Sequence, residues 1–89
     1  MSKASIRRAV RLGRYEYTAH ALDEMEEDNL SDADVMSVLQ NGQLVATLTD
    51  DPRGERYVIR QIAVPNDIEV ICRLLPSGLL RIITVYIVQ

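Results

Sequence analysis

The sequence lacks several features that define whole classes of protein. Its single cysteine, Cys72, allows no internal disulfide, and no Cys/His spacing offers a zinc site. No Gly-rich phosphate loop is present, and no run approaches the roughly 20 apolar residues of a membrane span. The N-terminus has no apolar signal-peptide core. We therefore expect a cytoplasmic protein with no metal, no cofactor and no membrane partner.

Large aromatic side chains are scarce as well. There is no Trp or Phe, and four Tyr supply all the aromatic residues. The core must therefore be built mainly from Ile, Leu, Val and Ala. The chain has 89 residues, of which 47% are hydrophobic and 26% are charged. This length and composition predict a single globular domain over residues 1–89.

Charge of one sign is missing from two stretches of the chain. Residues 1–14 contain five basic side chains and no acid, whereas residues 16–34 contain eight acids and no Lys or Arg. The net charge of −3 disfavours general nucleic-acid binding, but a local basic patch is sufficient to hold a short RNA. The alternative is that the two segments are solvated faces or contact one another.

Helical periodicity occupies the first half of the chain. Residues 3–12 repeat apolar side chains at helical spacing, and Gly13 follows as a stop signal. A second helix is expected to begin at Thr18, a residue type that commonly forms an N-cap. Its spacing places Leu22 and Met25 on the buried face.

The third helix has the clearest start signal. Ser31 and Asp34 form a capping box, and Leu30 and Val35 occupy the two positions of a hydrophobic staple. Gly42 ends this helix, and the pattern predicts that it takes a left-handed conformation.

The period changes to that of strands after residue 42. Four runs are expected to form strands: residues 43–49, 56–64, 68–75 and 79–89. Residues 14–18 are interpreted only as a short extended piece. Because the connections are short, neighbouring strands should be antiparallel. The predicted class is α+β, with N-terminal helices packed on one face of a roughly four-stranded antiparallel sheet.

Alternation assigns the side chains of the last two strands to faces. Two sets are expected to face the helices: Val70, Cys72 and Leu74 in one strand, and Ile83, Val85 and Ile87 in the other. The opposite side of the last strand then carries Ile82 with Thr84 and Tyr86. Together with Arg73, the two polar residues of this set are candidates for one polar surface of the sheet.

Three segments in order resemble the bacterial domain of unknown function 4258 family: "YTAHALDEM", "LSDADVMSVLQNG" and "RIITVY". The resemblance spans about residues 15–88. Members of that family are similar to small toxins of the RelE/ParE kind, which implies a RelE/ParE-like fold and a metal-independent RNA endonuclease. It also implies a cognate antitoxin protein as a partner, together with RNA or the ribosome. The chain departs from the family pattern at Glu24, where the family carries Arg.

Metal-independent RNA cleavage needs proton transfer and positive charge, and the resemblance implies a residue for each role. His20 is assigned as the proton donor to the leaving 5′-oxygen. Arg73 is expected to stabilise the phosphorane, and Tyr86 to orient the 2′-OH. The expected substrate-binding residues are Arg56, Arg60 and Thr84.

Each of these residues also has a purely structural interpretation. A histidine early in a helix, such as His20, often hydrogen-bonds the helix end. Arg73 and Arg81 can cover a sheet face with their aliphatic stems, and Thr84 and Tyr86 are common strand formers. The alternative function is therefore a non-catalytic interaction module on the same fold, docking through its acidic second helix. The sequence leaves the oligomeric state open.

Overall fold

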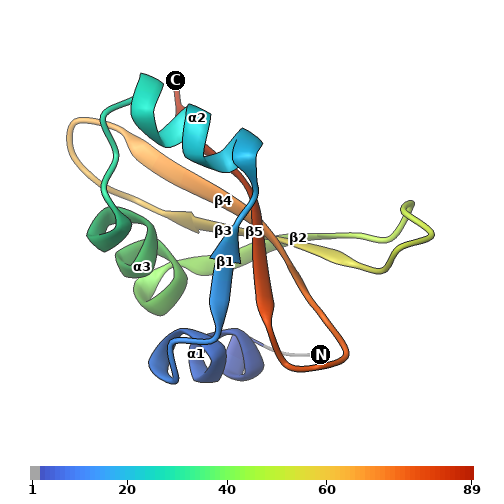
Figure 1. Cartoon of the computed structure of the whole chain (residues 1–89). Helices are drawn as coiled ribbons and strands as arrows, with labels where there is room; N and C mark the ends of the chain where they lie inside the picture. Colours follow the sequence, from blue (N-terminus) through green and yellow to red (C-terminus); the bar gives the residue numbers. More distant parts are fainter. Residues whose placement is uncertain (1–2) are drawn as a thin grey trace.

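A computed structural model describes residues 3–89 and has an α+β architecture (Figure 1). The elements are α1 (Lys3–Arg11), β1 (Tyr15–Tyr17), α2 (Ala19–Glu27), α3 (Asp32–Asn41), β2 (Gln43–Leu48), β3 (Arg56–Gln61), β4 (Asp67–Leu74) and β5 (Leu80–Val88). The helices precede the strand meander as predicted, so the α+β class is confirmed. None of the described helices is long and apolar enough to cross a membrane.

The sheet has five strands in the order β1-β5-β4-β3-β2. Strands β2 to β5 form the expected antiparallel meander. The prediction of about four antiparallel strands was incomplete, because β1 adds a fifth strand that runs parallel to β5. In this pair Tyr15 lies opposite Leu80, and Tyr17 lies opposite Ile82. The sheet is therefore mixed. Its first and last strands in the sequence, β1 and β5, lie side by side at one edge.

The core lies between the sheet and the helices. Ile6 of α1 and Leu39 of α3 are buried there against β-strand residues such as Ile59 and Cys72. Burial raises the pKa of the Cys72 thiol to about 12, so this side chain acts as a core residue rather than a nucleophile.

Helix α2 joins the same core beside β5, but not with all of the residues that were expected. Thr18 is its N-cap, as predicted, and its hydroxyl accepts the N–H of Ala21 at 3.1 Å. Ala21 and Met25 are buried, whereas Leu22 is 50% exposed. The placement of Leu22 on the buried face was wrong, because the face of α2 that packs on β5 is centred one residue earlier.

A β-bulge in β5 changes which side chains face the helices. Cys72 pairs with Ile82, whereas the preceding residue of β4 pairs with Thr84, so Ile83 is an extra residue in β5. Ile82 and Val85 are consequently both buried in the core, and Ile83 lines a cavity on the other side. The predicted faces of Ile82 and Ile83 were therefore wrong, since strict alternation fails at the bulge.

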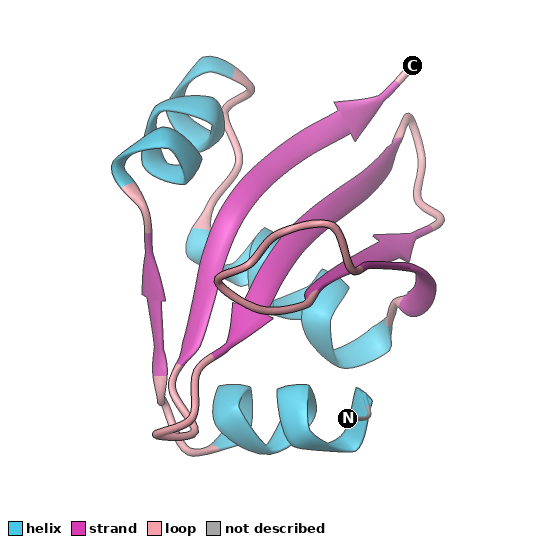
Figure 2. Cartoon of the chain, turned by 90° about the vertical axis from the view of Figure 1, so that its right-hand side faces the viewer, coloured by secondary structure: helices cyan, strands magenta, loops and turns pink. Residues whose placement is uncertain are grey.

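The side of the sheet away from α1 and α3 is here called the open face. In Figure 2 the connection between β2 and β3 crosses in front of this face, while α1 and α3 lie behind or below the strands. Arg73 of β4 and Asp51 of the connection are in contact, which holds the connection close to the open face. This arrangement encloses the cavity described below.

The start of α3 follows the predicted capping box. The hydroxyl of Ser31 accepts the N–H of Asp34 at 3.1 Å, and the Asp34 carboxylate accepts the N–H of Ser31 at 2.8 Å. Next to this box, Val35 is fully buried and Leu30 packs against the core. The box therefore satisfies two backbone donors at the point where the chain enters the core.

Replacing Ser31 with Ala is expected to lower the free energy of unfolding by about 1 kcal/mol, the usual scale for an N-cap. The backbone N–H of Asp34 then loses its acceptor. Urea denaturation measures the effect. The matched control is Ser5→Ala inside α1, where alanine favours the helix. An unchanged midpoint for Ser31→Ala would contradict the importance of this cap.

Candidate functional site

Three neighbouring strands each place an arginine on the open face at the same level of the sheet. Arg73 of β4 pairs with Arg81 of β5. Tyr57 pairs with Cys72, which puts Arg56 of β3 beside Arg73 on its other flank. Like charges side by side on a sheet are unfavourable. Such a row therefore needs carboxylates or an anionic ligand to stabilise it.

These arginines line a cavity of about 450 Å³ on the open face, here called the arginine cavity. Its lining residues are Thr18, Asp51, Arg53, Arg56, Arg73, Leu75, Arg81 and Ile83. Arg53 belongs to the β2–β3 connection and adds a fourth guanidinium. The lining thus carries four positive charges and one negative charge, on a chain whose net charge is −3.

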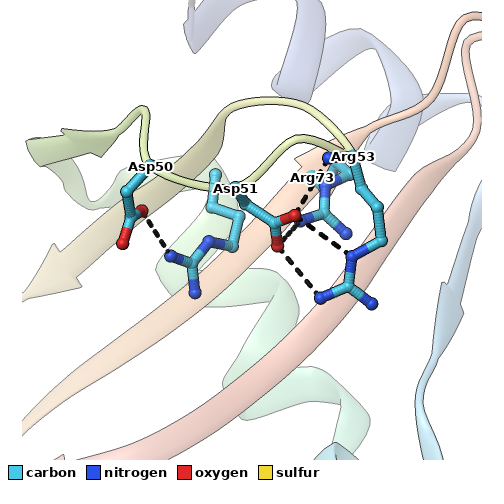
Figure 3. Close-up of polar contacts among 5 residues, drawn as sticks. Asp50, Asp51, Arg53 and Arg73 are labelled. Carbon is cyan, nitrogen blue, oxygen red and sulfur yellow. Dashed lines mark hydrogen bonds and ion pairs between the residues drawn. The ribbon is translucent and has the colours of Figure 1, made fainter.

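Asp51 is the acid within this cavity (Figure 3). Its carboxylate lies 2.7 Å from Nη2 of Arg73 and accepts two bonds from the Arg53 side chain, at 3.0 and 3.1 Å. Hydrogen bonds from the side chain and backbone of Arg53 hold the pKa of Asp51 well below its usual range, and the charge of Arg73 adds to the effect. Asp51 is therefore ionised at neutral pH.

The other arginines keep hydrogen-bonding capacity. Arg56 pairs with the exposed Asp50 at 2.8 Å, and Nε of Arg81 lies 2.7 Å from Glu16. The Nε atoms of Arg73 and Arg56 are buried and have no hydrogen-bond partner among residues 3–89. Because a buried donor without an acceptor costs free energy, an acceptor that reached these two atoms would be stabilised.

The predicted catalytic residues do not meet in this cavity. Arg73 lies within it and is only 6% exposed. Tyr86 pairs with Glu69, four residues before Arg73 on β4, which is roughly 13 Å along the strand. His20 is exposed near the start of α2 and does not line the cavity. No group of three or more His, Cys, Asp or Glu side chains within residues 3–89 is placed to hold a metal ion.

Tyr86 belongs to a second polar group on the open face. Its hydroxyl donates to Glu69, whose other carboxylate oxygen lies 3.4 Å from Nη1 of Arg60. This hydrogen bond, together with burial and the charges of Glu69 and Glu24, raises the pKa of Tyr86 to about 12. At neutral pH the phenol is therefore protonated, so it can orient a substrate oxygen but cannot act as a base.

The predicted substrate-binding residues divide between these two groups. Arg56 lines the arginine cavity with Arg73. Arg60 does not line it and is held by Asp67 at 2.9 Å. Thr84 lies on the open face between the two levels, because its partner on β4, Ile71, falls between Arg73 and the partner of Tyr86. The structure thus brings the predicted residues together as two separate pairs: Arg56 with Arg73 in the cavity, and Arg60 with Tyr86 around Glu69.

His20 and Glu24 lie at the edge of β5 where β1 has ended. Nε2 of His20 is 3.3 Å from Oε1 of Glu24, and the same oxygen accepts the backbone N–H of Val85 at 2.9 Å. Glu24 therefore satisfies an unpaired donor of the strand edge. This role requires a side chain with an acceptor oxygen, which an arginine at position 24 would lack.

Sequence reasoning missed three charged residues of the cavity. Asp51 and Arg53 lie between the predicted strands 43–49 and 56–64 and were given no role, and Arg81 was interpreted only as cover for the sheet. The available signal was the alternation of acids and arginines from Asp50 to Arg56. That alternation indicates ion pairs but does not show that the turn folds back onto Arg73.

One comparison with known proteins finds a family whose matched span contains all the residues of the arginine cavity. A family model described as Domain of unknown function (DUF4258) matches residues 17–87. No curated protein and no solved structure matches the chain. The matched span runs from the end of β1 to near the end of β5, so it includes every residue that lines the arginine cavity.

Proposed function

The chain belongs to the DUF4258 family, and we propose that it acts on RNA as a toxin of the RelE/ParE kind. In this proposal the RNA backbone binds in the arginine cavity. One observation carries the proposal: Arg56, Arg73 and Arg81 converge from three strands on one cavity. The expected protein partner is a cognate antitoxin, and the ribosome is the expected site of action.

Phosphate is the chemical group that fits the cavity best. A guanidinium binds phosphate through two parallel N–H bonds, and Arg73 and Arg56 each retain an unpaired Nε donor. The cavity lining, drawn from residues 3–89, includes no aromatic side chain on which a base would stack. The site therefore suits the backbone rather than the bases, and binding should weaken as the salt concentration rises.

The proposed reaction is metal-independent cleavage of the RNA chain. The 2′-oxygen attacks the adjacent phosphorus, and the 5′-oxygen leaves with a proton. Arg73 stabilises the charge on the phosphorane. The roles proposed for His20 as proton donor and for Tyr86 as the group that orients the 2′-OH require both side chains to move toward Arg73, because all three act on one phosphate. Tyr86 lies roughly 13 Å along the strand from Arg73, so the arginine cavity by itself supports RNA binding rather than cleavage.

Expression of the chain in a bacterium without a partner is expected to slow growth and to reduce the amount of intact messenger RNA. His20→Ala should remove both effects while the melting temperature stays nearly unchanged, because His20 is exposed. Growth curves and messenger RNA integrity measure the outcome. Harmless expression at high level, with intact messenger RNA, would refute the toxin proposal.

The His20→Ala variant also separates a catalytic role of His20 from a structural role. A folded variant that remains fully toxic would show that His20 takes no part in the reaction. A variant that unfolds would show a structural histidine. In the first case the arginine cavity would remain as an RNA-binding site without His20 as proton donor.

A second candidate function is a non-catalytic interaction module. Four acids are exposed on α2 and at its end: Asp23, Glu26, Glu27 and Asp28. Residues 16–34 contain no Lys or Arg, so this surface fits a basic protein partner. Changing Glu26 and Glu27 to Lys would abolish such docking, whereas it would leave an RNA-dependent toxicity in place.

A further inference from the structure

The β2–β3 connection places a carboxylate where an anionic ligand of the arginine cavity would bind. The Asp51 side chain is only 11% exposed, although it belongs to a turn. Arg53 holds it through a two-bond fork, and Arg73 holds it from the sheet (Figure 3). Carboxylate and phosphate oxygens use the same bidentate geometry with arginine. Asp51 is therefore an internal counterpart of a phosphate group.

Two ion pairs attach this connection to the strands. Asp51 contacts Arg73, and Asp50 contacts Arg56 at 2.8 Å. The remaining hydrogen bonds of Asp51 are local. Arg53 donates to its carboxylate, and the backbone N–H of Gly54 donates to its backbone carbonyl. A polar contact of this kind can exchange one anion for another without disturbing the hydrophobic core.

We infer that Asp51 occupies the ligand position of the arginine cavity and that an RNA phosphate must displace it from Arg73. The inference rests on the proposed RNA binding and adds a form of autoinhibition to it. While Asp51 remains on Arg73, its negative charge repels an incoming phosphate. Displacement rotates the Asp51 side chain away from Arg73 and from the Arg53 backbone N–H, which frees Arg73 for the RNA.

Binding of a short single-stranded RNA to the full chain, measured by fluorescence anisotropy, tests this inference. Asp51→Asn is expected to tighten binding by about tenfold or more, because it removes the competing charge. Glu55→Gln is the matched control, since it removes the same charge from an exposed position on the same connection. It should change the affinity by less than about threefold at physiological salt.

The wild-type chain gives a second test that needs no variant. The backbone N–H of Arg53 donates to Oδ1 of Asp51 at 2.9 Å. Saturation with RNA should therefore shift the NMR signal of the Arg53 amide strongly if Asp51 moves. An Arg53 signal that stays in place at saturation would show that Asp51 is not displaced, and it would overturn the inference.

The possible failures can be told apart. If the wild-type chain binds RNA and Asp51→Asn binds equally or more weakly, Asp51 positions Arg73 instead of competing, and only the inference falls. If neither the wild-type chain nor Asp51→Asn binds RNA, the proposed function falls as well. Tighter binding by Asp51→Asn, without a comparable change in Glu55→Gln, supports both.

Discussion

Arg73→Gln is expected to reduce the affinity for single-stranded RNA by about tenfold or more. Arg73 is the central member of the row, with Arg56 on one side and Arg81 on the other. Its side chain is buried and its Nε lacks a partner, so a bound phosphate would gain a desolvated, charge-assisted bond from it. Fluorescence anisotropy at fixed salt measures the loss.

The fold should tolerate this change. Asp51 keeps its fork to Arg53, so its carboxylate remains paired after the change. The matched control is Arg11→Gln at the exposed end of α1, which removes the same charge far from the cavity. Equal affinities for the two variants would show that RNA binding depends on net charge alone and not on the arginine cavity.

Signals that act within a few residues could be predicted from the sequence. The capping box at Ser31 involves atoms of residues three apart, and the N-cap at Thr18 acts over the same distance. The change of period after residue 42 likewise depends on local alternation. These features survive in the structure because short-range backbone hydrogen bonds and local burial agree with the global fold.

Features set by contacts between distant residues could not be predicted in this way. The three-residue strand β1 is defined by its pairing with β5 at the other end of the chain. The bulge at Ile83 depends on the register between β4 and β5. For the same reason the hydroxyl of Tyr86 is engaged by Glu69 from the neighbouring strand rather than by a residue near it in sequence.

The candidate site shows the same limit. Arg73 was identified from its place on the polar face of a predicted strand, and Arg56 was named for the role that the family resemblance implies. The ion pair between Asp51 and Arg73 joins residues 22 apart through a fold-back of the β2–β3 connection. Such a fold-back is set by the length and path of the turn, so the cavity that it encloses could not be derived from periodicity.

Gly42→Ala is expected to have the largest effect on stability, with a loss of about 3 kcal/mol in the free energy of unfolding. A Cβ at this position would lie 2.5 Å from the carbonyl oxygen of Val38, 2.8 Å from that of Arg60 and 2.9 Å from Cγ2 of Ile59. Two of these atoms belong to the backbone and cannot rotate away. For a domain of this size such a loss lowers the melting temperature by more than about 10 °C.

The physical reason differs from the one predicted from the sequence. Gly42 was expected to take a left-handed conformation, but its φ is −74°, which any residue adopts, so that prediction was wrong. Glycine is required here by the close approach of α3 to β3. Gly13 provides the contrast, because its φ is +69° and a Cβ there would meet no atom within 4 Å.

The matched variant Gly13→Ala should therefore cost only the conformational strain of about 1–2 kcal/mol. Thermal and urea denaturation of both variants compare a steric requirement with a conformational one. A smaller loss for Gly42→Ala than for Gly13→Ala would mean that α3 shifts away from β3 easily. In that case the junction between α3 and β3 would be more deformable than its close packing indicates. The arginine row lies on the other face of the same sheet.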